Sequence, residues 1–151
     1  MSTEHKPLIA VVGATSKQGR SVATTLLGSG RYRVRALTRN RTSPEAQKLA
    51  KLGAEIVVAP LELGRKDELL AAFKGAEGAY LMTPQLLPQD KTELPLGKQL
   101  ADAAVEAGVR HVVFSTLEND DKIADRKKFV PLFRDHPIVD NRAEFTAFTA
   151  L

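Results

Sequence analysis

Short apolar runs alternate with amphipathic stretches along most of the chain. The apolar runs are bounded by glycine, proline or charged residues, which is typical of buried strands. Between them, apolar residues recur at the spacing of one helix face. The strands predicted from the runs are 8–12, 33–38, 55–59, 79–82 and 111–114. The helices predicted between and after them are 18–27, 44–52, 68–74, 96–107 and 141–148.

Residues that favour helix ends support several of these boundaries. Ser43 stands before Pro44, which is a typical order for an N-cap followed by the first helical position. Asp67 is predicted to cap the third helix, and Asp140 or Asn141 the last one. A glycine follows each of the first four predicted helices, as expected for a residue that terminates a helix.

The regular alternation of strands and helices predicts an α/β fold, with a parallel sheet of about five strands flanked by helices. The length of 151 residues fits one domain, so residues 1–151 are predicted to form a single domain with 1–6 as a tail. Residues 117–139 are rich in charge and contain Pro131 and Pro137, which predicts an irregular loop region.

A loop that starts at Gly13 and ends at Gly19 joins the first strand to the first helix. In a Rossmann-type sheet this loop holds the pyrophosphate of a dinucleotide at a helix N-terminus. Glycine allows the tight turn and the close approach of a phosphate, although a tight turn without a ligand uses glycine too. Ser16 takes the middle position of the G-x-x-G-x-x-G frame. The side chains predicted to contact the phosphates are Thr15, Ser16, Lys17 and Gln18.

The residues that end the second strand distinguish NAD(H) from NADP(H). An acidic residue there binds the ribose 2′-hydroxyl, whereas an arginine accepts a 2′-phosphate. The strand ends in Thr38-Arg39-Asn40 without an acid, and Arg39 offers a planar fork suited to bidentate phosphate contact. Thr38 and Asn40 are predicted to support it. The domain is therefore predicted to bind NADP(H); the alternative for Arg39 is a solvent-exposed strand end.

The composition narrows the function further. The chain has no cysteine and three scattered histidines, so no metal site is predicted. No apolar run approaches the roughly 18 residues of a membrane helix, and the N-terminus lacks a secretory signal, so the cytoplasm is the expected compartment. Part of the net charge of +4 comes from an arginine cluster without an aromatic platform, which favours a solvated face over a nucleic-acid site. The cluster comprises Arg31, Arg33, Arg35, Arg39 and Arg41.

Several segments together resemble the NmrA-like family of atypical short-chain dehydrogenases. They are residues 9–15 with Gly19, 34–40, 52–55, 75–80 and Thr83-Pro84. The segment 108–115 with Leu117-Glu118-Asn119 is the most specific, and it is similar to the branch that includes NADPH-sensing regulators. The resemblance covers about residues 7–119. The chain departs from the family after the third strand, where Pro60-Leu61-Glu62-Leu63 replaces the usual acidic pair.

The resemblance implies a Rossmann fold that binds NADP(H). It assigns the 2′-phosphate to Arg39 and the path toward the nicotinamide to Thr83 and Pro84. It places Ser115 near the reactive ring, and Arg142 where the family has a lysine before the last helix. The residues that it assigns to the pyrophosphate are Gly13, Thr15, Ser16, Gln18 and Gly19. Family members continue into a substrate-binding C-terminal part, so this chain is expected to be a shortened relative without it.

Two functions remain open at this point. The first is an NADP-dependent oxidoreductase that acts on a small organic carbonyl or enone-type substrate. The Tyr-x-x-x-Lys motif of typical short-chain dehydrogenases is absent, because Tyr32 and Tyr80 both precede its place; Ser115 and Arg142 are then the catalytic candidates. The second is a non-catalytic NADP(H)-sensing regulator that acts through a protein partner, in the cytoplasm or the nucleus. A homodimer is a natural expectation, since a second chain would cover the far edge of the sheet.

Overall fold

The computed structural model describes residues 5–84 and 92–115, and in this part of the chain five strands form one parallel sheet. The strands are β1 (Leu8–Val11), β2 (Arg33–Thr38), β3 (Glu55–Val58), β4 (Gly78–Met82) and β5 (His111–Ser115). Their order across the sheet is β3-β2-β1-β4-β5. The chain thus builds the sheet outward from β1, first to one side and then to the other. In sheets of this kind, ligands bind outside the carboxyl ends of the strands at the point of reversal.

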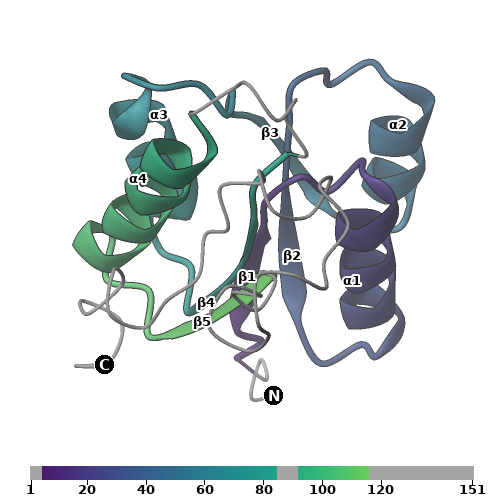
Figure 1. The fold of residues 1–151 in the computed structure, drawn as a ribbon. Helices are drawn as coiled ribbons and strands as arrows, with labels where there is room; N and C mark the ends of the chain where they lie inside the picture. The colour runs from purple at the N-terminus through teal and green to yellow at the C-terminus, as the bar shows by residue number, and fades with distance from the viewer. Residues whose placement is uncertain (1–4, 85–91, 116–151) are drawn as a thin grey trace, which may run out of the picture.

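Helices cover both faces of the sheet. They are α1 (Lys17–Gly28), α2 (Pro44–Lys51), α3 (Lys66–Phe73) and α4 (Glu93–Glu106). Helices α1 and α2 lie on one face, and α3 and α4 lie together on the other (Figure 1). Each helix returns the chain to the start of the next strand, as a parallel sheet requires.

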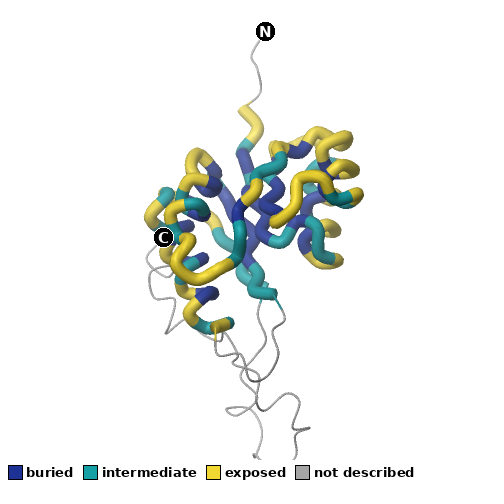
Figure 2. Tube along the Cα trace, turned by 90° about the horizontal axis from the view of Figure 1, so that it is seen from above, coloured by how far each residue is buried: buried dark blue, intermediate teal, exposed yellow. Residues whose placement is uncertain are grey.

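The hydrophobic core consists of two layers, one on each face of the sheet. Leu69 and Phe73 of α3 pack with Leu100 of α4 on one face, and all three are fully buried. Leu49 of α2 packs with Val11 of β1 on the other face. Figure 2 shows the buried segments at the centre and the exposed ones on the outer sides of the helices. Burial on both faces explains why β1 and β4 are apolar along their length rather than alternating.

The structure confirms the predicted α/β fold and places all five predicted strands within one residue of their expected ends. Ser43 caps α2 as predicted, since its hydroxyl accepts a 3.2 Å hydrogen bond from the Ala46 amide. The prediction that Asp67 caps α3 is wrong. Helix α3 begins at Lys66, and Arg65 at the N-cap makes no side-chain capping bond. Asp67 lies in the first turn, where its carboxylate still interacts favourably with the helix dipole.

Two further boundaries need comment. Helix α4 begins at Glu93, before the predicted start at residue 96. The predicted irregular region 117–139, the predicted helix 141–148 and the first part of the predicted tail lie outside the described residues. Within the described residues, no helix is long and apolar enough to cross a membrane.

Candidate cofactor-binding site

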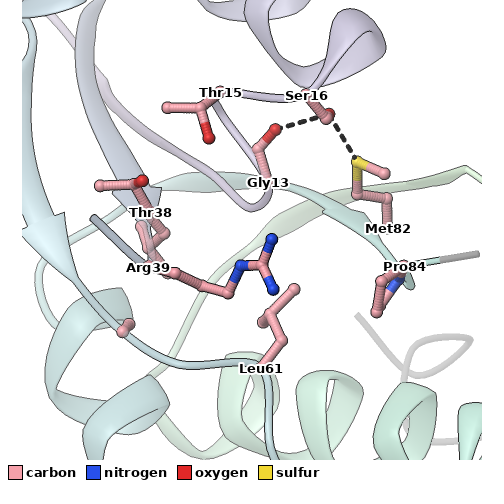
Figure 3. Close-up of a pocket in the computed structure, with 10 residues that line it drawn as sticks. Gly13, Thr15, Ser16, Thr38, Arg39, Leu61, Met82 and Pro84 are labelled. Carbon is pink, nitrogen blue, oxygen red and sulfur yellow. Dashed lines mark hydrogen bonds between the residues drawn. The ribbon is translucent and has the colours of Figure 1, made fainter. Parts of the chain in front are cut away.

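The carboxyl ends of β1, β2 and β4 meet at one edge of the sheet. Val11 of β1 pairs with Ala36 on one side and with Tyr80 on the other, so the segments after these strands border the same space. A cavity of about 450 Å³ lies there (Figure 3). Its lining residues are Gly13, Thr15, Ser16, Leu37, Thr38, Arg39, Ala59, Leu61, Met82 and Pro84.

The two glycines of the loop between β1 and α1 are there for different physical reasons. Gly13 has a φ of +62°, a left-handed backbone conformation that residues other than glycine rarely adopt. Gly19 has an ordinary φ, but there is no room for a side chain: a Cβ atom there would lie 2.7 Å from the carbonyl carbon of Gly13. The loop therefore folds back onto the first turn of α1, and this packing brings Gly13 and the helix N-terminus to the same wall of the cavity.

Ser16 is the N-cap of α1 and holds the loop closed. Its hydroxyl accepts a 3.2 Å hydrogen bond from the Gly19 amide and donates one of 2.6 Å to the Gly13 carbonyl oxygen. The hydroxyl oxygen of Ser16 also lies 3.3 Å from the sulfur of Met82. The first turn of α1 carries no acidic residue, so its positive dipole end faces the cavity uncompensated by side chains. An anion placed beside this loop would interact favourably with that end.

Gln18 and Ser115 meet across the end of the sheet. The Ser115 hydroxyl at the end of β5 donates a 2.8 Å hydrogen bond to the side-chain oxygen of Gln18 in α1. This contact ties the fifth strand to the first turn of α1, but neither residue lines the cavity. Lys17 is exposed and also lies outside the lining.

Arg39 follows β2 and extends its side chain into the cavity. Figure 3 shows its guanidinium between Gly13 and Leu61. Among the described residues, no carboxylate lies within ion-pair distance of Arg39 (Arg35 and Arg110, by contrast, are each paired with a glutamate). A positive fork on the cavity wall, facing the phosphate loop, suits a second phosphate group.

The other arginines of the cluster do different work. Arg35 is a structural brace, since it pairs with Glu55 at 3.0 Å and donates 2.8 and 2.7 Å hydrogen bonds to the last carbonyls of α3 at Ala72 and Lys74. Arg31 lies over the ring of Tyr32, 5.7 Å from its centroid. The cluster is therefore divided among separate places in the fold instead of forming one basic face.

Asn40 is turned away from the cavity. Its side-chain oxygen accepts hydrogen bonds of 2.9 Å from the Thr42 amide and 2.8 Å from the Thr42 hydroxyl. Its own amide donates to the Thr38 hydroxyl at 3.2 Å. Asn40 and Thr38 thus shape the turn after β2, and only Thr38 belongs to the cavity lining.

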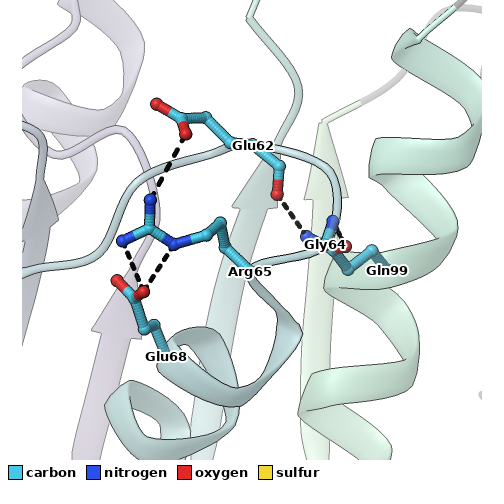
Figure 4. A network of polar contacts seen from close by, with 5 residues as sticks. All are labelled: Glu62, Gly64, Arg65, Glu68 and Gln99. Carbon is cyan, nitrogen blue, oxygen red and sulfur yellow. Dashed lines mark hydrogen bonds and ion pairs between the residues drawn. The ribbon is translucent and has the colours of Figure 1, made fainter.

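Leu61, in the loop after β3, forms an apolar part of the cavity wall. The neighbouring Glu62 points away and pairs with Arg65 at 3.4 Å, while Arg65 also pairs with Glu68 (Figure 4). Gln99 of α4 fastens the same loop at two points, through a 2.8 Å bond to the Glu62 carbonyl and a 2.9 Å bond from the amide of the next glycine, residue 64. The loop is therefore held so that Leu61, and not Glu62, borders the cavity.

Several predicted site residues come together here and others do not. Gly13, Thr15, Ser16, Arg39 and Pro84 line the cavity. Gly19 shapes the loop from behind, and the Thr83 hydroxyl donates a 2.9 Å bond to Glu93 at the start of α4. The predicted Arg142 lies outside the described residues. Lining residues to which the sequence analysis assigned no contact with the cofactor are Leu37, Ala59, Leu61 and Met82, which all stand at or just after strand ends. Within the described part of the chain, no His, Cys, Asp and Glu gather as metal ligands would.

The fold and the cavity define a Rossmann-type α/β protein with its candidate site at the topological switch point. The chain belongs to the NmrA-like family, whose sequence pattern it matches over residues 5–144. It is 44% identical over 124 residues to the NmrA-like family domain-containing oxidoreductase lnaB of Aspergillus flavus, covering 77% of this chain and 35% of that protein. The chain thus spans about a third of that relative's length.

Two solved structures of NmrA, a negative transcriptional regulator, share the fold. The complex with NADP has a TM-score of 0.70 and 28% identity, covering 86% of this chain and 39% of NmrA. The complex with NAD has a TM-score of 0.71 and 26% identity, covering 95% of this chain and 41% of NmrA. The predicted family and its Rossmann fold are thereby confirmed.

Proposed function

We propose that the chain binds NADP(H) in the cavity beside the loop from Gly13 to Gly19. The pyrophosphate lies against this loop and the N-terminus of α1, and Arg39 binds the 2′-phosphate. The observation that carries the proposal is Arg39 itself, an arginine on the cavity wall without a carboxylate partner among the described residues. The NADP complex of NmrA supports the choice of ligand.

The groups of the dinucleotide fit the different parts of the lining. The apolar side chains of Leu37, Ala59 and Leu61 lie on the same side of the cavity as Arg39 and suit the adenine ring, which is flat and largely apolar on its faces. Pro84 and Met82 at the end of β4 lie on the side toward β5, where the nicotinamide would extend.

The decisive experiment compares NADPH and NADH binding by the wild type and Arg39→Ala. Loss of a charge-assisted bidentate contact is expected to weaken NADPH by about 10- to 100-fold, with NADH unchanged. Arg33→Ala is the matched control, because Arg33 lies on β2, which Arg39 directly follows, is exposed like Arg39 and does not line the cavity. An equal loss for both cofactors in Arg39→Ala would contradict the assignment of the 2′-phosphate.

For the complete protein we propose an NADP-dependent oxidoreductase that reduces a small organic carbonyl or enone-type substrate. The 44% identical relative described as an oxidoreductase supports this reading. Hydride transfer is the chemistry of the cofactor, and the chain supplies its position and orientation. Of the two catalytic candidates, only Ser115 lies among the described residues. It ends β5, and its hydroxyl donates a hydrogen bond to the side chain of Gln18 in α1. Oxidation of NADPH with a panel of ketones, quinones and enones tests the proposal, and Ser115→Ala tests the candidate.

The second candidate function is an NADP(H)-sensing regulator that acts through a protein partner. NmrA, described as a negative transcriptional regulator, favours it, as does the absence of a Tyr-x-x-x-Lys motif in the sequence. The two functions separate in one comparison. A regulator shows partner affinity that changes with bound NADPH and no turnover with the panel, whereas an oxidoreductase shows turnover.

A further inference from the structure

The sulfur chemistry of this chain is unusually simple. The sequence contains two methionines, Met1 and Met82, and no cysteine. Met1 lies outside the described residues, and Met82 stands at the end of β4 with its side chain in the cavity lining. Oxidation of sulfur in this chain is therefore confined to two positions, of which Met82 borders the proposed cofactor site.

Met82 packs directly against the phosphate loop. Its sulfur lies 3.3 Å from the Ser16 hydroxyl oxygen, and the two are joined by a dashed line in Figure 3. A Cβ atom placed on Gly13 would lie 2.8 Å from the same sulfur, so there is less than a carbon atom's room between them. The side chain is partly exposed, and the exposed part faces the cavity.

We propose that Met82 is a site of reversible oxidation by hydroperoxides, and that its sulfoxide weakens dinucleotide binding in the cavity. The sulfur lone pair attacks an oxygen of the hydroperoxide, the O–O bond breaks and an S–O bond forms. Sulfur gives up two electrons, the proton of the transferred oxygen passes to the second oxygen of the hydroperoxide, and that oxygen leaves as water or an alcohol. Methionine sulfoxide reductases reverse the step, one enzyme for each epimer. The regulatory consequence rests on the proposed NADP(H) binding.

Either epimer of the sulfoxide disturbs the site. An oxygen on the lone pair that faces Ser16 takes up the space between the two side chains and displaces the hydroxyl that caps α1 and holds the Gly13 carbonyl. An oxygen on the other lone pair enters the cavity. This oxygen carries partial negative charge and would lie beside the pyrophosphate. The sulfur of unoxidised Met82 carries no such charge and does not repel the pyrophosphate. Both outcomes oppose an anion at this loop.

The test treats the full chain with hydrogen peroxide and follows three quantities. Peptide mass spectrometry measures oxidation at Met1 and at Met82 separately, fluorescence titration measures the NADPH dissociation constant, and circular dichroism reports folding. Oxidised wild type is expected to bind NADPH at least about tenfold more weakly, equivalent to about 1.4 kcal/mol. Bound NADP⁺ is expected to slow oxidation at Met82 and not at Met1. Sulfoxide reductase is expected to restore the affinity.

Met82→Leu is the matched variant, because the substitution conserves volume and removes the sulfur while Met1 still oxidises. Each protein is compared with its own untreated form, and the NADPH affinity of the variant is expected to be insensitive to peroxide. Full oxidation at Met82 with unchanged affinity would overturn the proposal, as would oxidation at Met1 without oxidation at Met82. Failure of the untreated wild type to bind NADPH would instead remove the proposed function, and the regulation with it.

Discussion

Gly19→Ala is the substitution for which the structure makes the sharpest prediction. Gly19 is buried in the first turn of α1, and a Cβ atom there would lie 2.7 Å from the Gly13 carbonyl carbon and 3.1 Å from the Cα of Ala14. Ordinary contacts begin at 3.4 Å. Both obstructing atoms belong to the backbone, so no side chain can rotate to make room, and the loop must move away from the helix.

The magnitude follows from two opposing effects. Overpacking of a tight site costs about 1–3 kcal/mol, and backbone obstruction places this site at about the upper end. Alanine in a helix is more favourable than glycine by about 1 kcal/mol, which offsets part of that cost. A net loss of about 2 kcal/mol is expected, which lowers Tm by about 4–8 °C for a chain of this size. NADPH binding is expected to fall with it, because the displaced loop is the proposed phosphate site.

Gly28→Ala provides a control in the same helix. Gly28 ends α1, and a Cβ atom there would meet no other atom within 4 Å. This variant is expected to gain up to about 1 kcal/mol and keep its cofactor affinity. Thermal unfolding followed by circular dichroism, with and without NADPH, measures both variants. A Gly19→Ala protein as stable as Gly28→Ala would refute the argument from close packing.

Three further predictions concern the loop, the apolar wall and the opposite end of the sheet. Ser16→Ala removes the cap of α1 and is expected to cost about 1 kcal/mol, measured by urea unfolding. Leu61→Asp places negative charge on the cavity wall and is expected to weaken NADPH by about tenfold, whereas Leu63→Asp, 46% exposed and outside the lining, is expected to leave the affinity unchanged. Hydrogen bonds from His5 and from the guanidinium of Arg110 lower the pKa of Glu77 below its ordinary value of 4.5. A lowered carboxyl pKa stabilises the fold above the ordinary value, and this contribution is lost as the pH falls through the lowered pKa. The stability difference between the wild type and Glu77→Gln is therefore expected to be present above the ordinary value of 4.5 and to be lost as the pH falls through the lowered pKa.

The strands could be predicted closely because their signal is local. β1 and β4 are apolar runs between breaking residues, and β2 has the bounds predicted for it, residues 33–38. The cap at Ser43 was also predictable, since capping depends on the residue and its immediate successors. The cap predicted at Asp67 was wrong, and the contacts of the loop before α3 are with a residue far along the chain. Gln99 of α4 fixes the preceding loop through the Glu62 carbonyl, and the helix begins before Asp67 can cap it.

The residues of the candidate site also fall into those that could be predicted from the sequence and those that could not. Gly13 and Arg39 could be selected from the sequence because the loop spacing and the strand end mark them. Met82 could not, because nothing in its neighbours along the chain distinguishes it from a core residue, and Leu61 was noted only as part of the segment that departs from the family, without a place on a cavity wall. They line the cavity only because β4 and the loop after β3 end beside β1, which is a property of the strand order.

Among the described residues, those that line the cavity all lie between Gly13 and Pro84 in the sequence, ahead of α4 and β5. Helix α4 and β5 nevertheless hold this pocket from outside, through Gln99 on the loop before α3 and Ser115 on Gln18, so that changes downstream of Pro84 can act on the pocket without replacing any of these lining residues.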